Sequence, residues 1–187
     1  MPRKSTIQKE ELIECGLNLI RQEGWPSIGI RSLARAAGCS TQPVISHFPT
    51  LEALQKELWK AAERLQEQML FDIQPDQDFL MQIGKNYIRF ALEEPRLFQT
   101  VFDSDWNQPA SLQNMLEDPA LQPILSQIQA ETALTRKQTL QMFGILSMLL
   151  HGYASLAASG QLQPDLKQFE ADLVLLFDSL LSKLTSE

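Results

Sequence analysis

The stretch Gly29–Phe48, GIRSLARAAGCSTQPVISHF, decides the fold of this chain. It predicts two short helices joined by a tight turn, with Gly38 at the corner and the small side chain of Ala34 where the helices cross. Ser40 stands where the second helix needs an N-cap, because its hydroxyl can accept free backbone N–H groups there. Pro43 falls in the first turn of that helix, where a missing N–H costs little.

The second helix of this pair divides its side chains between two faces. Val44 and Phe48 are four residues apart and therefore face inward together. The side chains that remain outward are short and polar: Thr41, Gln42, Ser46 and His47. A helix with such a surface suits the major groove of DNA, and the pattern predicts a DNA-binding helix-turn-helix. An ordinary helical hairpin with a solvated polar surface is the alternative.

The residues on either side extend the pattern. Upstream, apolar residues recur at helical spacing from Leu12 to Ile20, and Gly24 follows as a common C-terminal stop. Downstream, Thr50 caps a predicted long helix over residues 51–71. A helix, a helix-turn-helix and a long connecting helix together resemble the TetR/AcrR family of transcriptional regulators.

The resemblance runs without a gap from Leu12 to Leu54. The family's first-helix pattern matches LIECGLNLIRQEGW, its turn matches LARAAGCS, and the pattern that follows matches VISHFPTLEAL. Two positions depart from the family: Ile45 replaces a tyrosine that commonly bonds a DNA phosphate, and Leu51 replaces a lysine. We expect the DNA contacts to come from Arg31, Ser40, Thr41, Gln42, Pro43, Ser46 and His47, with Arg3 and Lys4 as a basic arm.

The charge distribution permits a nucleic-acid partner although the net charge is −7. Residues 1–60 carry eight basic and six acidic side chains, about +2, which leaves about −9 for the remainder. Because phosphate affinity depends on the field within about one Debye length, a modestly basic surface can work on an acidic protein. Cys15 and Cys39 fit a reducing cytoplasm, and the polar, basic residues 1–9 do not resemble a secretory signal.

The rest of the sequence keeps the helical pattern and shows no strand alternation. Further helices are predicted over Phe79–Leu92 after an Asp78 cap, from Pro95, from Pro119 to near Ala130, over Thr135–Ser159, and over Asp165–Lys183. The sequence therefore predicts an all-α fold. It comprises an N-terminal three-helix helix-turn-helix domain (residues 1–50), a connecting helix (51–71), and a helical effector-binding and dimerisation domain (72–187).

Residues 142–158 are almost uncharged, so a membrane span is one interpretation. The segment is shorter than the roughly 20 residues that a bilayer requires, and polar residues interrupt it, which favours a buried helix. The apolar stripes on the last two helices are wider than one small domain can cover, and this predicts a four-helix interface with a second copy. We expect that interface to include Gly144, Met148, Gly152, Ser155, Leu173, Phe177 and Leu180.

No pattern in the sequence predicts catalysis, a metal site or a cofactor, because Cys/His metal spacings, G-x-S-x-G turns and phosphate-binding glycine loops are lacking. The segments YIRFALEEPRLF and LLHGYASLAASG resemble TetR-family C-terminal domains that carry a His-Gly pair. That resemblance implies an effector cavity, although the same side chains fit an ordinary core. The candidate lining residues are Tyr87, Phe90, Phe98, Phe102, Phe143 and His151.

The sequence as a whole predicts a homodimeric, cytoplasmic transcriptional repressor rather than an enzyme. Its expected partners are a double-stranded DNA operator, a second copy of the chain and a small-molecule effector, with no membrane. An effector would respace the two DNA-reading heads through the connecting helix and release the operator. The alternative, which Ile45 and Leu51 favour, is a protein of this fold that binds another protein or sequesters a small molecule.

Overall fold

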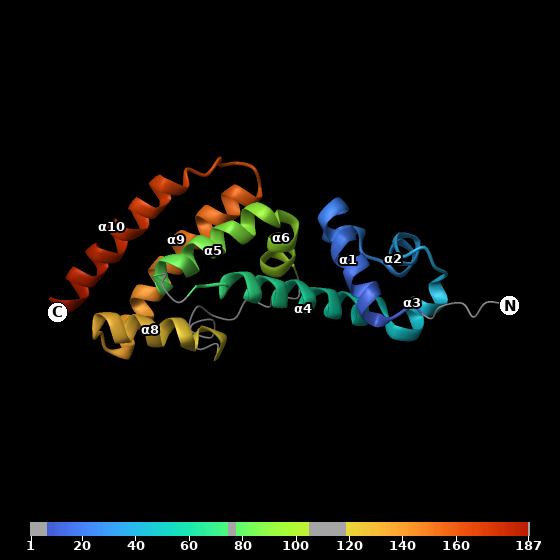
Figure 1. The fold of residues 1–187 in the computed structure, drawn as a ribbon, viewed down its shortest axis with the longest axis horizontal. Coiled ribbons are helices and arrows are strands. Elements are labelled where there is room, and N and C mark those ends of the chain that lie inside the picture. The colour runs from blue at the N-terminus through green and yellow to red at the C-terminus, as the bar shows by residue number, and fades with distance from the viewer. Residues whose placement is uncertain (1–6, 75–77, 105–118, 187) are drawn as a thin grey trace. The chain divides into compact units, whose positions relative to one another are not determined.

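The computed structural model describes residues 7–74, 78–104 and 119–186, and the regular elements among them are all helical (Figure 1). The predicted all-α fold class is confirmed for this part of the chain. The α-helices are α1 (Lys9–Glu23), α2 (Ile30–Ala36), α3 (Thr41–His47), α4 (Leu51–Leu70), α5 (Phe79–Glu93), α6 (Pro95–Asp103), α8 (Gln122–Thr132), α9 (Arg136–Ala158) and α10 (Leu166–Thr185). Two 3₁₀ turns, η1 (Trp25–Ser27) and η2 (Pro119–Leu121), lie between them.

The chain divides into two compact units. The head unit comprises Met1–Gln68 with Glu93–Asn107, and the body unit comprises Met69–Leu92 with Gln108–Glu187. The predicted boundary at residue 72 separates a DNA-binding part from an effector-binding and dimerisation part. Because it divides the chain by function, it stays a prediction. By contacts, α6 groups with the N-terminal part of the chain, whereas the sequence placed it in the C-terminal part.

A closed apolar core holds the head unit together. The spacing of apolar residues in α1 and α4 buries one face of each helix, as their periodicity predicts. Gly16 of α1 lies directly against the side chain of Leu58, so that a Cβ at this position would collide with it. Gly16 therefore leaves room for the buried Leu58 side chain between α1 and α4. The buried head residues include Leu12, Leu19, Ile20, Leu33, Ala34, Val44, Phe48, Leu54, Leu58, Leu97 and Phe98.

Polar contacts attach α6 to the rest of the head unit. The Arg21 guanidinium donates hydrogen bonds of 2.9–3.0 Å from Nε and Nη2 to the carboxylate of Glu94. Arg96 donates to the carbonyl of Arg21 at 3.2 Å, and the indole N–H of Trp59 donates to the carbonyl of Val101 at 3.3 Å. These bonds join residues more than 40 positions apart, which explains why local sequence patterns did not reveal the grouping.

In the body unit, α9 and α10 run antiparallel. Near one end, the Gln138 side chain donates to the carbonyl of Leu184 at 2.6 Å, and near the other, the Tyr153 hydroxyl donates to the carbonyl of Asp165 at 3.3 Å. α5 packs closely on α10 at Gly84, where a Cβ would lie 3.0 Å from a methyl group of Leu173.

The predicted helix boundaries agree closely with the structure, and most predicted caps are confirmed. The predicted caps Thr50 and Asp78 each accept a hydrogen bond from a backbone N–H in the first turn of the following helix. Thr135 and Asp165, which were predicted only as the first residues of their helices, cap α9 and α10 in the same way. Ser40 occupies the N-cap of α3 as predicted, but its hydroxyl makes no capping bond, so that part of the prediction is wrong.

The helix α9 is long and apolar enough to span a membrane by length and composition, with a mean hydropathy of 1.3. Only 28% of its apolar window is buried within the chain. The expectation of a buried helix therefore holds for one side of α9 only. The other side carries exposed apolar residues, among them Ile145, Met148, Leu149 and Leu156.

Candidate nucleic-acid interface and ligand cavity

The turn between α2 and α3 has the geometry that a helix-turn-helix requires. Gly38 adopts a φ of +63°, a left-handed conformation that favours glycine. The backbone N–H of Cys39 donates to the carbonyl of Ala34 at 2.9 Å, which closes the turn. Ala34 is 3% exposed, as expected for a small residue where two helices cross. The predicted corner and crossing are confirmed.

The outer face of α3 carries exposed polar side chains. Thr41, Gln42 and Ser46 are exposed on this helix, whereas Val44 and Phe48 are buried beneath it. Arg31 of α2 and Ser40 of the turn are also exposed, and Pro43 is half-buried. The structure therefore presents most of the expected DNA-contacting residues to solvent from one packed unit. Arg3 and Lys4 lie outside the described residues.

His47 differs from the expectation of an outward side chain. It is half-buried, and its Nε2 lies 3.1 Å from the carbonyl oxygen of Ile7. The imidazole thus bonds the backbone that precedes α1, so its role is to hold that segment against α3. The contact joins residues 40 positions apart, and nothing in the sequence indicated it.

Lys9 makes a second connection between α1 and the rest of the head unit. Its ammonium group pairs with the carboxylate of Glu57 in α4 and lies 5.8 Å from the ring centroid of Phe48. The hydrogen bond from Lys9 lowers the pKa of the Glu57 carboxyl. Lys9 of α1 therefore contacts both α4 and Phe48, the residue that follows α3.

Ile45 and Leu51, the two departures from the family pattern, are both exposed. Each side chain is 43% exposed, Ile45 on α3 and Leu51 at the first position of α4. Neither belongs to the head core, so larger or charged side chains would meet solvent at both positions.

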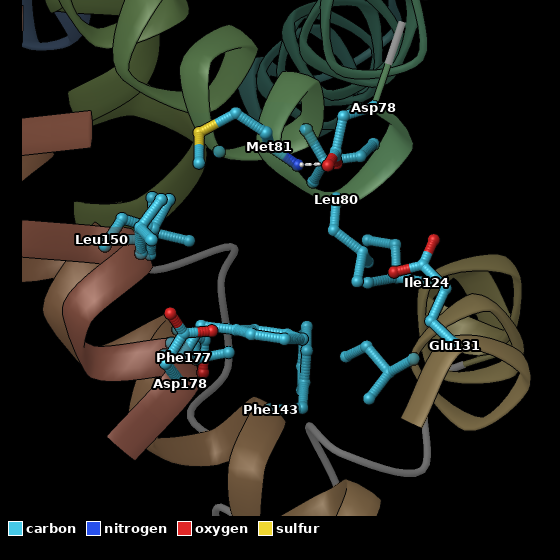
Figure 2. Close-up of a pocket in the computed structure, with 16 residues that line it drawn as sticks. Asp78, Leu80, Met81, Ile124, Glu131, Phe143, Leu150, Phe177 and Asp178 are labelled. Atoms are coloured by element: carbon cyan, nitrogen blue, oxygen red, sulfur yellow. Dashed lines mark hydrogen bonds between the residues drawn. The ribbon is translucent and has the colours of Figure 1, made fainter. Parts of the chain in front are cut away.

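A cavity of about 280 Å³ lies within the body unit, between α5, α8, α9 and α10 (Figure 2). Its wall is mainly apolar, and acidic side chains lie at its rim. Ser147, the hydroxyl-bearing lining residue, donates to the carbonyl of Gly144 within α9. The full lining is Asp78, Leu80, Met81, Ile83, Gly84, Ile124, Ile128, Glu131, Phe143, Leu146, Ser147, Leu150, Leu173, Val174, Phe177 and Asp178.

Of the six residues expected to line an effector cavity, Phe143 lines this one. Phe90 is 1% exposed and belongs to the core. Tyr87 and His151 form a polar pair between α5 and α9, with the hydroxyl 3.0 Å from Nδ1 of the imidazole. Phe98 and Phe102 pack against each other in the head unit, with ring centroids 4.7 Å apart and the ring planes tilted by 47°. Aromatic content therefore did not identify this wall, which consists mainly of aliphatic residues.

The predicted dimer surface is divided between exposed and buried positions. Met148 and Gly152 are exposed on α9, and Met148 is 57% exposed. Gly144 and Leu173 are buried within the chain, and Phe177 lines the cavity. Ser155 and Leu180 are half-buried. Leu175, which is not among the residues predicted for the dimer surface, is 67% exposed on α10.

Burial raises the pKa of the Cys15 thiol, which disfavours the reactive thiolate and agrees with a structural role for this residue. Among the described residues, no group of three or more His, Cys, Asp or Glu side chains is placed to hold a metal ion.

The chain is similar in sequence to one known protein family. A family model for a "Tetracyclin repressor-like, C-terminal domain" matches residues 80–184, more than half of the chain. No curated protein matches at a significant level.

Solved structures are similar over nearly the whole chain. A TetR-family protein from Vibrio parahaemolyticus has 16% identity and a TM-score of 0.66, covering 92% of this chain and 97% of its own. A TetR-family regulator from Streptomyces coelicolor has 19% identity and a TM-score of 0.68, covering 95% and 87%. A TetR variant from Acinetobacter baumannii AYE in complex with minocycline has 17% identity and a TM-score of 0.59, covering 96% and 97%. At these identities the similarity is one of fold.

Proposed function

Because this chain belongs to the TetR family of transcriptional regulators, we propose that it is a homodimeric, ligand-responsive repressor that binds a palindromic operator. The observation that carries the proposal is the exposed polar face of α3, presented by a helix-turn-helix with a closed core. A recognition helix needs side chains that reach base edges from a fixed position, and this face supplies them. Family members are generally cytoplasmic proteins without enzymatic activity, and we infer both properties for this protein.

Within this proposal, the two polar residues best suited to read bases are Arg31 and Gln42. Arginine bonds guanine through two parallel hydrogen bonds, and glutamine bonds adenine in the same manner. Thr41, Ser46 and Ser40 are short and suit contacts with phosphate or with base edges nearby. His47 acts indirectly, because its ring bonds the carbonyl of Ile7.

Dimerisation is proposed on the exposed apolar residues of α9 and α10. Ile145, Met148, Leu149, Leu156 and Leu175 are each more than a third exposed in the single chain. Exposed apolar area on two neighbouring helices is typical of an interaction site in a soluble protein. A second copy that presents the same surface would cover it and form a symmetric four-helix contact.

The repressor mechanism is competition between DNA and effector for two dimer conformations. A ligand that binds one conformation more tightly shifts the population by that difference in affinity and no more. The first turns of α5 line the body cavity together with residues of α8, α9 and α10. A ligand there contacts all four helices and can therefore favour one arrangement of them. The proposed output is a change in the spacing of the two heads, transmitted along α4.

DNase footprinting on the DNA that flanks the gene tests the proposal. We expect protection of a pseudo-palindrome with half-sites one or more helical turns apart. Gln42→Ala should weaken operator binding by about 1–3 kcal/mol and binding to random DNA only slightly. Equal losses on both DNAs would assign Gln42 to phosphate positioning instead. A protein that never prefers any site over random DNA would support the alternative, a protein-binding or sequestering module, for which the exposed apolar Ile45 and Leu51 are the supporting observation.

A further inference from the structure

The cavity of the body unit has an apolar interior of defined size. Eleven of its lining side chains are aliphatic, Met or Phe residues that come from four helices, and about 280 Å³ of space lies between them. An apolar cavity of roughly 150 Å³ accommodates one benzene molecule, so this one accommodates a ligand of about a dozen non-hydrogen atoms. Aromatic faces are available at Phe143 and Phe177. The interior of the cavity therefore suits the apolar part of a ligand.

The ionisable groups of the cavity are all acidic. Asp78, Glu131 and Asp178 are exposed at its rim, and none of the lining residues is a lysine, arginine or histidine. Figure 2 shows Asp78 and Glu131 on one side of the cavity and Asp178 on the opposite side. The rim thus surrounds the opening with negative charge.

These carboxylates keep their charge available for a ligand. One oxygen of Asp78 accepts the backbone N–H of Met81 at 2.8 Å, and Glu131 accepts from the neutral side chain of Gln127 at 2.7 Å. The ion pairs found among the described residues involve neither of these two groups nor Asp178. Neutral donors leave the negative charge of a carboxylate uncompensated.

The wider charge distribution adds to this local effect. The body unit carries eleven acidic and six basic side chains, a net charge of about −5, so it produces a field that attracts cations and repels anions. An anionic ligand would place its charge beside three carboxylates, and a neutral ligand would leave them unused. The complementary ligand has an apolar body with a positive charge at one end.

We propose that this cavity binds amphipathic organic cations, with the apolar part between the four helices and the cationic group at the acidic rim that Asp78, Glu131 and Asp178 form. The inference rests on the proposed function only in taking this cavity as the effector site. The faces of Phe143 and Phe177 add favourable contacts to an ammonium group that lies near them. The effector class would then be cationic amphiphiles of about a dozen non-hydrogen atoms.

Calorimetric titration of the full-length protein, without DNA, tests the proposal. Three probes share one eight-carbon chain and differ in charge: octyltrimethylammonium, 1-octanol and octyl sulfate, each used below its micelle concentration. We expect octyltrimethylammonium to bind about tenfold or more tightly than 1-octanol, and octyl sulfate to bind most weakly. The preference for the cation should decrease as salt increases, because the rim carboxylates are exposed.

Two variants locate the charge preference. Glu131→Gln and Asp178→Asn should each weaken octyltrimethylammonium binding by about three- to tenfold and leave 1-octanol binding unchanged. Unchanged octanol binding also shows that the cavity remains folded. Asp172→Asn is the matched control, since Asp172 is an exposed aspartate of α10 that does not line the cavity. It should leave both affinities as they are.

The outcomes separate this inference from the proposed function. Equal affinity for the cation and the alcohol, tighter binding of octyl sulfate, or an equal effect of Asp172→Asn and Asp178→Asn would each overturn the inference, while operator footprinting would be unaffected. Failure of the protein to bind any operator would reject the repressor but leave the measured charge preference of the cavity in place.

Discussion

The head unit and the body unit differ in how completely a single chain fills them. In the head, Leu12, Leu33, Val44 and Leu58 are all 0% exposed, and the outer surface of α3 is polar. The body also buries residues fully, but it contains a cavity of about 280 Å³ and leaves apolar residues of α9 and α10 in solvent. Protein interiors are normally close-packed, so such space and exposed apolar area indicate binding sites. The difference shows that the head core is filled by a single chain, whereas the body keeps internal space and exposed apolar surface, where we propose that a ligand and a second copy bind.

The largest effect is expected where the body is incomplete. Met148→Glu or Leu175→Glu would place a charge on the exposed apolar surface proposed for dimerisation, and we expect monomers and a loss of operator affinity of about a hundredfold or more. Light scattering and operator titration on the same samples measure both. Leu92→Glu, at an apolar residue of α5 that is 37% exposed, is the control and should remain dimeric.

A tightly DNA-bound monomer in that experiment would contradict the comparison. Leu173 and Phe177 are less suitable positions for this test than the sequence indicated. Leu173 is 7% exposed and Phe177 lines the cavity, so a charge at either would disturb the interior of one chain.

The second prediction tests the closed core of the head. Gly16→Ala would place a methyl group against Leu58, and overpacking of this kind costs about 1–3 kcal/mol. We expect a lower midpoint in thermal unfolding and weaker DNA binding, with cavity binding unchanged. Glu14→Ala, at an exposed position of the same helix, should leave unfolding within about 0.5 kcal/mol of the wild type. A Gly16→Ala protein as stable as the wild type would show that the head core has space to spare.

The sequence predicted the head better than the body, for physical reasons. Helices, caps and the Gly38 turn depend on residues close in sequence, and α1 and α3 of the head begin and end near their predicted positions. The cavity depends on side chains that four helices bring together, and an apolar stripe at helical spacing does not distinguish a cavity wall from a dimer surface. Phe177 illustrates this, since it was expected at the interface and lines the cavity.

Contacts between residues far apart in the sequence could not be predicted from local patterns either. The bond of His47 to the carbonyl of Ile7 and the grouping of α6 with α1 both join distant residues. Aromatic residues were predicted as ligand contacts because of their type. In the structure, Phe90 is buried in the core of the body unit and Phe98 is buried in the head unit. The Tyr87–His151 pair was included for its residue types, and the structure joins the two residues to each other.

The third prediction tests the surface of the head at its two departures from the family. Leu51→Lys would add one phosphate contact in each subunit, and the log–log slope of operator affinity against salt should steepen by nearly two units, at about 0.9 for each lysine. Ile45→Tyr should strengthen binding with a smaller change in slope, because its hydroxyl is neutral. Both wild-type side chains are 43% exposed, so neither change should lower thermal stability by overpacking. An unchanged slope for Leu51→Lys would remove position 51 from the DNA surface.

The smallest effect is expected for the ion pair that joins α1 to α4. The hydrogen bond from Lys9 lowers the pKa of the Glu57 carboxyl in the folded protein relative to its ordinary value. A depressed pKa stabilises the fold above the ordinary pKa, and this contribution is lost as pH falls through the lower, folded value. The pair is partly exposed, with 39% and 31% of its side chains accessible, so screening keeps the contribution to about 0.5 kcal/mol.

Glu57→Gln should therefore lower the stability of the head near neutral pH by about that amount and make no difference in strong acid. Urea unfolding from pH 7 down to pH 3 measures the difference between wild type and variant, and added salt should reduce it. Glu52→Gln, at an exposed carboxylate of the same helix, is the control and should show no such pH dependence. A Glu57→Gln deficit that stays constant across this range would mean that Glu57 stabilises α4 by packing, because a charged carboxylate must lose its contribution once it is protonated.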